Sequence, residues 1–579
     1  MSHSVNGFDS GELATVQATW GIAHPTGYPF FAILGFIFSK IPLPFSTIFK
    51  LNLLCVLWNS LTIFFLIKTV KYILENIEYF VINNDNNKLK WLNIDKRFIL
   101  IISILSSLSF AFSVTFWEQA SRIEVYSLQL FLTSVIIFFS IKEFTTIKKD
   151  QVKIFSKNLL IIAIFLGLAF SNHLMTIYLI PALLYLFFNY KGINKKSLIL
   201  FFELSLIIVS IAVFFYLLMM FRAQMSPPYI FSNPSSISKL ISHVQAEEYR
   251  DFMFKGLGTV KKQSIKLLKM LSFDSNKNFI SGEFSFMLIF VFSGIIFSSI
   301  FFKKLFIWSI LLISTCLFFA FNYSIPDINE YYLVVFLCFA IMISISLIIL
   351  FSFLKNKINK IILLVVAFVF VISQLFTNYN LSNKRNDFFA EDYTKSLLNS
   401  LPKGSFLISQ DWTFLISPSL YLQNVGAYRK DVKIISTYWM QKDWYKKDLA
   451  KKYGSLREIQ KKDYYVTFDV VKNLIDKNKF NLGAHNFIVP DVFTFKIVHN
   501  QIYYPAEDPD FKIHFSEDRN KYEEFYYSLI AWMLENRAKY ELSFNKVGRA
   551  KLYIKKILTD FPDYKITPDL IDLVKNKKL

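Results

Sequence analysis

The sequence predicts an α-helical membrane protein with about ten transmembrane helices and a C-terminal soluble domain of mixed α and β structure. Two properties carry this prediction: 54% of the 579 residues are hydrophobic and only 18% are charged. A soluble protein of this length would form several domains with far more surface charge. The same composition argues against disorder, a coiled coil or a nucleic-acid-binding domain, despite a net charge of +21.

About ten apolar runs approach the roughly 20 residues needed to cross a bilayer. They lie at 49–67, 98–116, 126–141, 154–171, 175–190, 198–221, 284–302, 305–323, 331–353 and 361–376. We therefore expect a transmembrane domain over 46–376. The three cysteines, Cys55, Cys316 and Cys338, all lie inside such runs, which excludes a disulfide framework or a cysteine-based zinc site.

Beyond residue 376 the apolar runs stop, and residues 377–579 carry 33 Lys and Arg beside 25 Asp and Glu. This part is predicted to be a soluble domain. The stretch Tyr464–Asp469 has the composition of a strand, and apolar residues recur at helical spacing over 522–564. We expect the domain to end in a helical hairpin there.

The basic residues predict the orientation, because loops rich in Lys and Arg remain in the cytoplasm. One set of alternate loops carries 19 basic residues, whereas the short loops of the other set carry only Lys40, Lys50 and Arg122. The second set then faces outward, together with the large loop 222–283, the N-terminus and the domain 377–579. In a bacterium the chain would lie in the inner membrane with this domain in the periplasm.

The turns predicted to face outward are rich in acidic residues. They hold six carboxylates, those of Asp9, Glu12, Glu118, Glu124, Asp327 and Glu330. Carboxylates beside hydrocarbon are costly to keep charged and mark substrate paths, ion sites or proton chemistry. The structural alternative is that these turns are simply solvated.

Residues 1–45 are predicted to form an outward interfacial loop. Within Trp20–Pro29, two prolines and two glycines prevent a regular membrane helix, and Asp9 and Glu12 have the spacing to share one face of a short turn. The run 30–41 is too short to span, so we expect an amphipathic or re-entrant element at the surface.

Two motifs in this loop carry a resemblance to a known family. Asp9-Ser-Gly-Glu12 followed by His24-Pro-Thr-Gly-Tyr-Pro29 resembles a group of bacterial multi-spanning proteins filed as a domain of unknown function. That group is similar to the vertebrate enzyme that O-mannosylates plexin and Met-type receptor domains. Further stretches agree in order: 116–126, 167–173, 221–228, 322–327 and 401–423.

The resemblance implies a GT-C glycosyltransferase. Such an enzyme takes a sugar, mannose in the related enzyme, from a polyprenyl-phosphate donor and places it with inversion on a hydroxyl of a protein or glycan outside the cytoplasm. Relatives have a transmembrane helix before the Asp-Ser-Gly-Glu motif, whereas eight residues precede Asp9 here. A truncated chain or a misassigned start explains this difference, and we expect one span fewer and impaired insertion or activity.

The implied reaction needs a base for the acceptor hydroxyl and cationic or hydrogen-bonding groups for the departing phosphate. Asp9 is the candidate base, and Glu12 would orient the acceptor or the first turn. The candidate ligands of the donor phosphate are Arg222, Arg122, His24 and His173. The candidate acceptor-binding or supporting residues are Glu118, Glu124, Tyr126 and Asp327.

Each of these residues also has a structural alternative. Asp9 could cap the following helix, Arg222 could be a charged stop at the membrane surface, and Glu118 with Arg122 could form a simple ion pair. A lone histidine near an interface is more often structural. No ligand spacing predicts a metal site, and no cofactor is predicted beside the lipid-linked donor.

Two other classes of protein remain open. A transporter of lipid-linked or small polar substrates would have as many spans, but with inverted repeats and polar residues near mid-membrane. A non-catalytic envelope scaffold would not need the outer carboxylates. The expected partners are a polyprenyl-phosphate sugar, a protein or glycan acceptor and the bilayer, with no nucleic acid.

Overall fold

The computed structural model describes residues 1–81, 94–145, 155–271, 282–454, 464–476, 487–516 and 519–575. The chain forms two compact units. The transmembrane unit comprises Met1, residues 22–45 and residues 50–384, and the C-terminal unit comprises residues 2–21, 46–49 and 385–579. The start of the chain, with its Asp-Ser-Gly-Glu motif, is therefore part of the C-terminal unit.

Within the described residues, seven helical segments are long and apolar enough to cross a membrane. They are α3 (Thr47–Glu75), α6 (Val125–Thr145), η3 with α8 (Leu174–Lys191), α9 (Lys195–Gln224), α13 (Lys303–Phe321), η6 with α14 (Ile328–Phe353) and α15 (Lys357–Ser382). The helices α4 (Lys96–Ala111) and α5 (Val114–Ser121) form an eighth, which is bent by 71°. The prediction of a multi-spanning helical protein is confirmed.

Three apolar helices are shorter than a full span: α2 (Pro29–Ser39), α7 (Lys157–Asn172) and η5 with α12 (Ser285–Phe301). All ten predicted runs therefore coincide with helices, but 154–171 and 284–302 correspond to short ones. The first residue of the run 154–171 lies outside the described residues. The run 30–41 corresponds to α2, which begins at Pro29, a position where proline starts helices readily.

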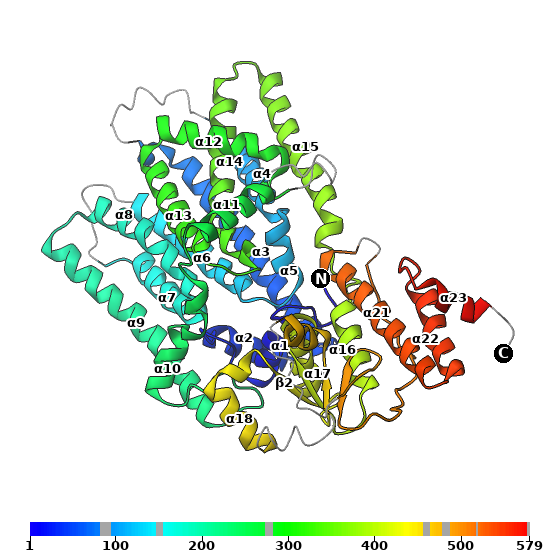
Figure 1. Cartoon of the computed structure of the whole chain (residues 1–579). Coiled ribbons are helices and arrows are strands. Elements are labelled where there is room, and N and C mark those ends of the chain that lie inside the picture. Colours follow the sequence, from blue (N-terminus) through cyan, green and yellow to red (C-terminus); the bar gives the residue numbers. More distant parts are fainter. Residues whose placement is uncertain are drawn as a thin grey trace. The chain divides into compact units, whose positions relative to one another are not determined.

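The helix α14 forms the core of the transmembrane unit. In its most apolar stretch 89% of the residues are buried, whereas in that of α9, which is also strongly apolar, 11% are buried. A helix that is apolar all round suits either a protein interior or a lipid-facing position. α12 and α4 pack on α14 (Figure 1). Gly294 allows the close approach of α12, because a Cβ there would lie 1.9 Å from the Met342 carbonyl oxygen.

A five-stranded mixed sheet organises the C-terminal unit. Its strand order is β2-β1-β3-β5-β4, in which β1 pairs in parallel with β2 and β3, and β5 pairs antiparallel with β3 and β4. The strands are β1 (Phe406–Ser409), β2 (Lys433–Ser436), β3 (Tyr464–Val466), β4 (Phe487–Pro490) and β5 (Phe495–Val498). The strand-like stretch 464–469 thus ends early, because α20 begins at Phe468.

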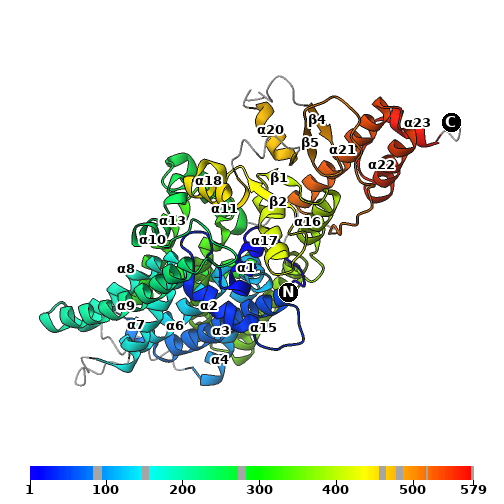
Figure 2. The ribbon, with the colours of Figure 1, turned by 90° about the horizontal axis from the view of Figure 1, so that it is seen from below.

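The rest of the C-terminal unit is largely helical. Its helices are α1 (Ser10–Thr19), α16 (Phe389–Ser400), α17 (Ser417–Asn424), α18 (Asp443–Tyr453), α20 (Phe468–Asp476), α21 (Lys521–Ser543), α22 (Val547–Asp560) and α23 (Pro568–Lys575). The predicted helical hairpin is confirmed as α21 and α22, which lie side by side (Figures 1 and 2). Asn520 begins the hairpin with a capping box to Glu523.

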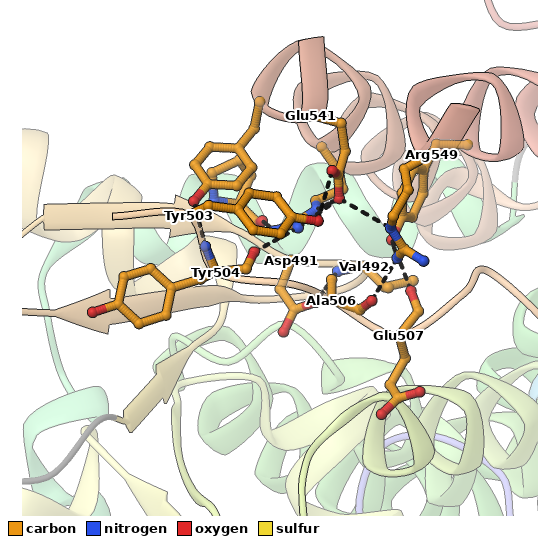
Figure 3. Close-up of polar contacts among 12 residues, drawn as sticks. Asp491, Val492, Tyr503, Tyr504, Ala506, Glu507, Glu541 and Arg549 are labelled. Atoms are coloured by element: carbon orange, nitrogen blue, oxygen red, sulfur yellow. Dashed lines mark hydrogen bonds and ion pairs between the residues drawn. The ribbon is translucent and has the colours of Figure 1, made fainter. Parts of the chain in front are cut away.

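A buried ion network joins the hairpin to the sheet (Figure 3). Arg537 and Glu541 on α21 are 1% and 0% exposed, with Arg537 Nη2 lying 2.7 Å from Glu541 Oε1. Arg537 also donates to the carbonyls of Pro490 and Tyr504, and Tyr503 donates its hydroxyl to Glu541. A buried pair of this kind needs all its polar atoms satisfied, and these contacts supply the partners.

Candidate functional site

The turn between α5 and α6 places Arg122 among carboxylates of the transmembrane unit. Arg122 Nη2 lies 3.0 Å from Glu330 Oε1, and Arg122 Nε lies 3.8 Å from Glu124 Oε1. Gln119 Nε2 donates to the same Glu330 oxygen at 3.2 Å. The Arg122 side chain is only 14% exposed, so this is a buried network and not a surface ion pair.

The electrostatics of Arg122 show which predicted residues gather around it. Burial lowers the pKa of Arg122, but the charges of Glu124, Glu118, Glu330 and Asp327 outweigh burial and hold its pKa above the ordinary value. The charges of four of the six outer carboxylates predicted from sequence thus act on one guanidinium. Glu330 belongs to that acidic set but not to the predicted site residues, although its bond to Arg122 is the shortest.

An aromatic and imidazole cluster lies in the same unit. The His173 ring stacks on Tyr28 with centroids 5.6 Å apart and packs against Tyr126 at 5.5 Å and Tyr331 at 6.1 Å. The Tyr28 hydroxyl lies 2.9 Å from His24 Nε2. The structure therefore brings the predicted residues His24, His173 and Tyr126 together through Tyr28.

His173 is a neutral hydrogen-bonding group in this cluster. Its Nδ1 accepts the backbone N–H of Met175 at 3.0 Å, which leaves the proton of the neutral ring on Nε2. Burial, together with the charge of His24, lowers the pKa of His173 to about 3. His173 can donate one hydrogen bond but does not supply a positive charge near neutral pH.

Asp9 and Glu12 are positioned by the C-terminal unit. Within α1, all of whose residues the structure describes, the Asp9 side chain makes no capping hydrogen bond. Asp9 Oδ1 instead accepts the indole N–H of Trp412 at 2.6 Å. Glu12 is fully buried, and its backbone N–H donates to Ser417 Oγ at 3.0 Å. The capping alternative for Asp9 is therefore wrong.

Trp412 follows the C-terminal end of β1. In open sheets with parallel strands, ligands bind beyond the carboxyl ends of the strands, where loops bring side chains together. Asp411 starts the turn, with Oδ1 accepting the Phe414 N–H at 2.9 Å and Oδ2 accepting the Tyr526 hydroxyl at 2.6 Å. Burial raises the pKa of Asp411 to about 6.

Arg222 lies in the last turn of α9, with Nη1 3.9 Å from Met225 Sδ. Its role as a ligand of the donor phosphate stays a prediction. Several residues of these clusters were missed from the sequence, among them Tyr28, Glu330 and Trp412. Tyr28 stands inside the His24–Pro29 motif, Glu330 among the outer carboxylates and Trp412 inside the stretch 401–423, so each had a signal, but none that gave its partner.

The amino-acid sequence of the chain is similar to those of known proteins. Residues 9–196 match the family described as the protein O-mannosyl-transferase TMEM260 N-terminal domain. The chain is 25% identical to the protein O-mannosyl-transferase tmem260 of Dictyostelium discoideum, over 76% of this chain and 56% of that protein. It is 22% identical to the TMEM260 protein of Mus musculus, over 78% of this chain and 62% of that protein.

Among solved structures, ArnT from Cupriavidus metallidurans in the apo state has a similar fold. The TM-score is 0.50 at 10% sequence identity, covering 86% of this chain and 94% of ArnT. The predicted fold is therefore confirmed, because the chain has a fold similar to that of ArnT, with membrane-spanning helices followed by a C-terminal domain. The predicted resemblance to the protein O-mannosyltransferases is likewise confirmed, by a domain match that begins at Asp9. The chain spans only 56% and 62% of the length of these curated relatives.

Proposed function

We propose that this protein is a membrane glycosyltransferase. It moves a sugar, mannose by analogy with the curated relatives, from a polyprenyl-phosphate donor to a hydroxyl of a protein or glycan. The transfer takes place on the outer face of the membrane, which in a bacterium is the periplasmic face of the inner membrane. The observation that carries the proposal is the Asp9 carboxylate, which begins the matched domain and is held by an indole N–H instead of capping α1.

The proposed reaction is an inverting displacement. The acceptor oxygen bonds to the anomeric carbon while the bond from that carbon to the phosphate oxygen breaks, and the acceptor proton passes to the Asp9 carboxylate. The electron pair of the broken bond leaves with the polyprenyl phosphate, which is a good leaving group and needs no strong acid. The scheme uses no cofactor beside the lipid-linked donor.

In this scheme the donor phosphate is bound by Arg222 and by other hydrogen-bond donors of the transmembrane unit. His24, Tyr28 and neutral His173 provide N–H and O–H groups in one cluster. Arg122 is less suited to bind phosphate directly, because Glu330 and Glu124 already engage its guanidinium. Its proposed role, with Glu118, Glu124 and Asp327, is to fix the outer turns that carry Tyr126 and Tyr331.

The test uses the full chain in detergent with a polyprenyl-phosphate mannose labelled in the sugar. Release of labelled mannose to water and transfer to serine- and threonine-containing peptides are both measured. We expect Asp9→Asn to lower both rates by about 100-fold or more, because a general base contributes about that much. Asp443→Asn is the control, since that side chain is 87% exposed on α18.

Two results would contradict the proposal. Wild-type rates in Asp9→Asn would remove the base assignment. No release or transfer from any polyprenyl-phosphate sugar by the wild-type chain would favour a transporter or an envelope scaffold.

A further inference from the structure

We propose that Trp412 is a positioning residue that aims the Asp9 carboxylate, which makes the turn after β1 part of the catalytic machinery. The proposal rests on the proposed function, in which Asp9 is the base. Its central observation is the hydrogen bond from Trp412 Nε1 to Asp9 Oδ1, 2.6 Å long, between residues 403 positions apart in the chain.

The indole is held on a rigid support. Trp412 begins a single π-helical turn, Trp412–Ile416, which the Asp411 carboxylate stabilises by accepting the Phe414 N–H. Tyr526 on α21 donates to the other Asp411 oxygen, and Thr394 on α16 donates to the Phe414 carbonyl at 2.7 Å. Two helices distant in sequence therefore fix the backbone that carries the indole.

A second ring limits the rotation of the indole. Trp439, which follows β2 and is 7% exposed, packs edge-on against Trp412 with centroids 6.2 Å apart. β1 and β2 are parallel neighbours, so their carboxyl ends place the two tryptophans side by side. Edge-to-face packing of this kind favours one orientation of the ring.

The backbone around Asp9 is docked on the same turn. The Phe8 N–H donates to the Thr413 carbonyl at 3.1 Å, and the Glu12 N–H donates to Ser417 Oγ at 3.0 Å. Gly11 lies directly against Ser417, where a Cβ would be 2.2 Å from the carbonyl oxygen. Both partners of the Trp412–Asp9 bond thus belong to one packed substructure.

The hydrogen bond to Trp412 gives Asp9 a role other than the helix capping that is usual for an aspartate at this position. Asp9 immediately precedes α1, where an aspartate normally turns its carboxylate onto the first N–H groups of the helix. Here the backbone of Asp9 is helical, with φ −84° and ψ −4°, in place of the extended conformation of a capping residue, and the indole N–H binds Oδ1 instead. A helix that forgoes its cap gives up stability, and natural proteins accept such local losses chiefly where function requires them.

This arrangement predicts different effects of Trp412 on activity and on stability. In Trp412→Phe a ring is retained but the donor is lost, so the Asp9 carboxylate loses its fixed orientation. We expect kcat for mannose release to fall 10- to 100-fold while KM for the donor is unchanged, since an orienting contact acts on the transition state. The unfolding temperature should be unchanged or higher.

A double-mutant cycle isolates the pair. If Trp412 acts through Asp9, Trp412→Phe should have little further effect in the Asp9→Asn background. Trp412→His, which keeps a ring N–H, should recover part of the lost kcat. Trp532→Phe is the matched control, because that indole packs against Phe468 and Phe495 in the same unit.

The outcomes separate the two proposals. If Asp9→Asn is inactive and Trp412→Phe retains wild-type kcat, the role of Trp412 is wrong and the proposed function stands. If Asp9→Asn is fully active, the assignment of Asp9 as the base fails, and the role of Trp412 fails with it. A raised KM at constant kcat, or a lowered unfolding temperature that Trp412→His does not restore, would make Trp412 a binding or structural residue and overturn the inference.

Discussion

Asp491 shows how burial controls the charge of a single side chain in this protein. It precedes the turn between β4 and β5, is 5% exposed, and accepts the Val492 N–H on Oδ1 at 2.8 Å (Figure 3). Burial raises its pKa to about 6, and the N–H of Val492 and the charges of Arg537 and Lys496 offset burial only in part. Removal of the carboxylate from water is the dominant effect.

This shift predicts a dependence of stability on pH. Because the folded pKa lies above the ordinary value, the contribution of Asp491 to stability is fully present below about pH 4 and is lost as pH rises through 6. At pH 7.5, Asp491→Asn should therefore raise the free energy of unfolding by at most about 3 kcal/mol, and the unfolding temperature with it. At pH 4 the substitution should have little effect. Tryptophan fluorescence during heating measures this. An equal effect at both pH values would contradict it.

At the scale of elements, the docking of α1 depends on one small residue. Gly11 is on the face of α1 that lies against the first turn of α17, and the atoms it meets, the Ser417 carbonyl and the Pro418 nitrogen, are backbone atoms. Backbone cannot yield as a flexible side chain does, so the close approach requires glycine here. The Asp-Ser-Gly-Glu motif thus contains a packing residue beside its acids.

We expect Gly11→Ala to push α1 off α17. Overpacking costs about 1–3 kcal/mol, and here it also displaces Asp9 from Trp412. Limited proteolysis should cut more rapidly within residues 2–21, and sugar transfer should fall. Gly548→Ala is the matched control, because Gly548 also lies in a helix but a Cβ there has no neighbour within 4 Å. Equal proteolysis of both variants would show that the contact is not required.

At the scale of the whole molecule, the distribution of charge predicts the orientation. Residues 1–376 contribute +13 and residues 377–579 contribute +8 to the net charge of +21. In the first part the basic residues are concentrated in alternate loops, which predicts that these loops face the cytoplasm. The periplasmic position of the C-terminal unit stays a prediction of this rule.

Labelling of single cysteines with a membrane-impermeant maleimide tests the orientation. We expect Lys512→Cys, in the C-terminal unit, to react in intact spheroplasts, and Lys195→Cys, at the start of α9, to react only after permeabilisation. Both lysines are exposed. The native cysteines are buried and should give little background. The reverse pattern would invert the proposed topology and place Asp9 in the cytoplasm.

The sequence by itself determined the helical membrane architecture, the resemblance to the O-mannosyltransferases and the terminal hairpin. Each of these is encoded locally, because a bilayer requires continuous apolar segments and a helix repeats its apolar face every turn. Local hydropathy did not reveal that 154–171 and 284–302 form short helices or that α14 is the buried one, since burial depends on neighbouring helices.

Only the tertiary structure decided the partners of the site residues. Arg122 is paired with Glu330, 208 residues away, and Asp9 with Trp412, 403 residues away. From sequence alone, Asp9 has the features of a helix cap and Arg122 those of a surface ion pair. These two structural alternatives to the predicted roles follow from local rules, and both are replaced because packing supplies a distant partner in a closer and drier position.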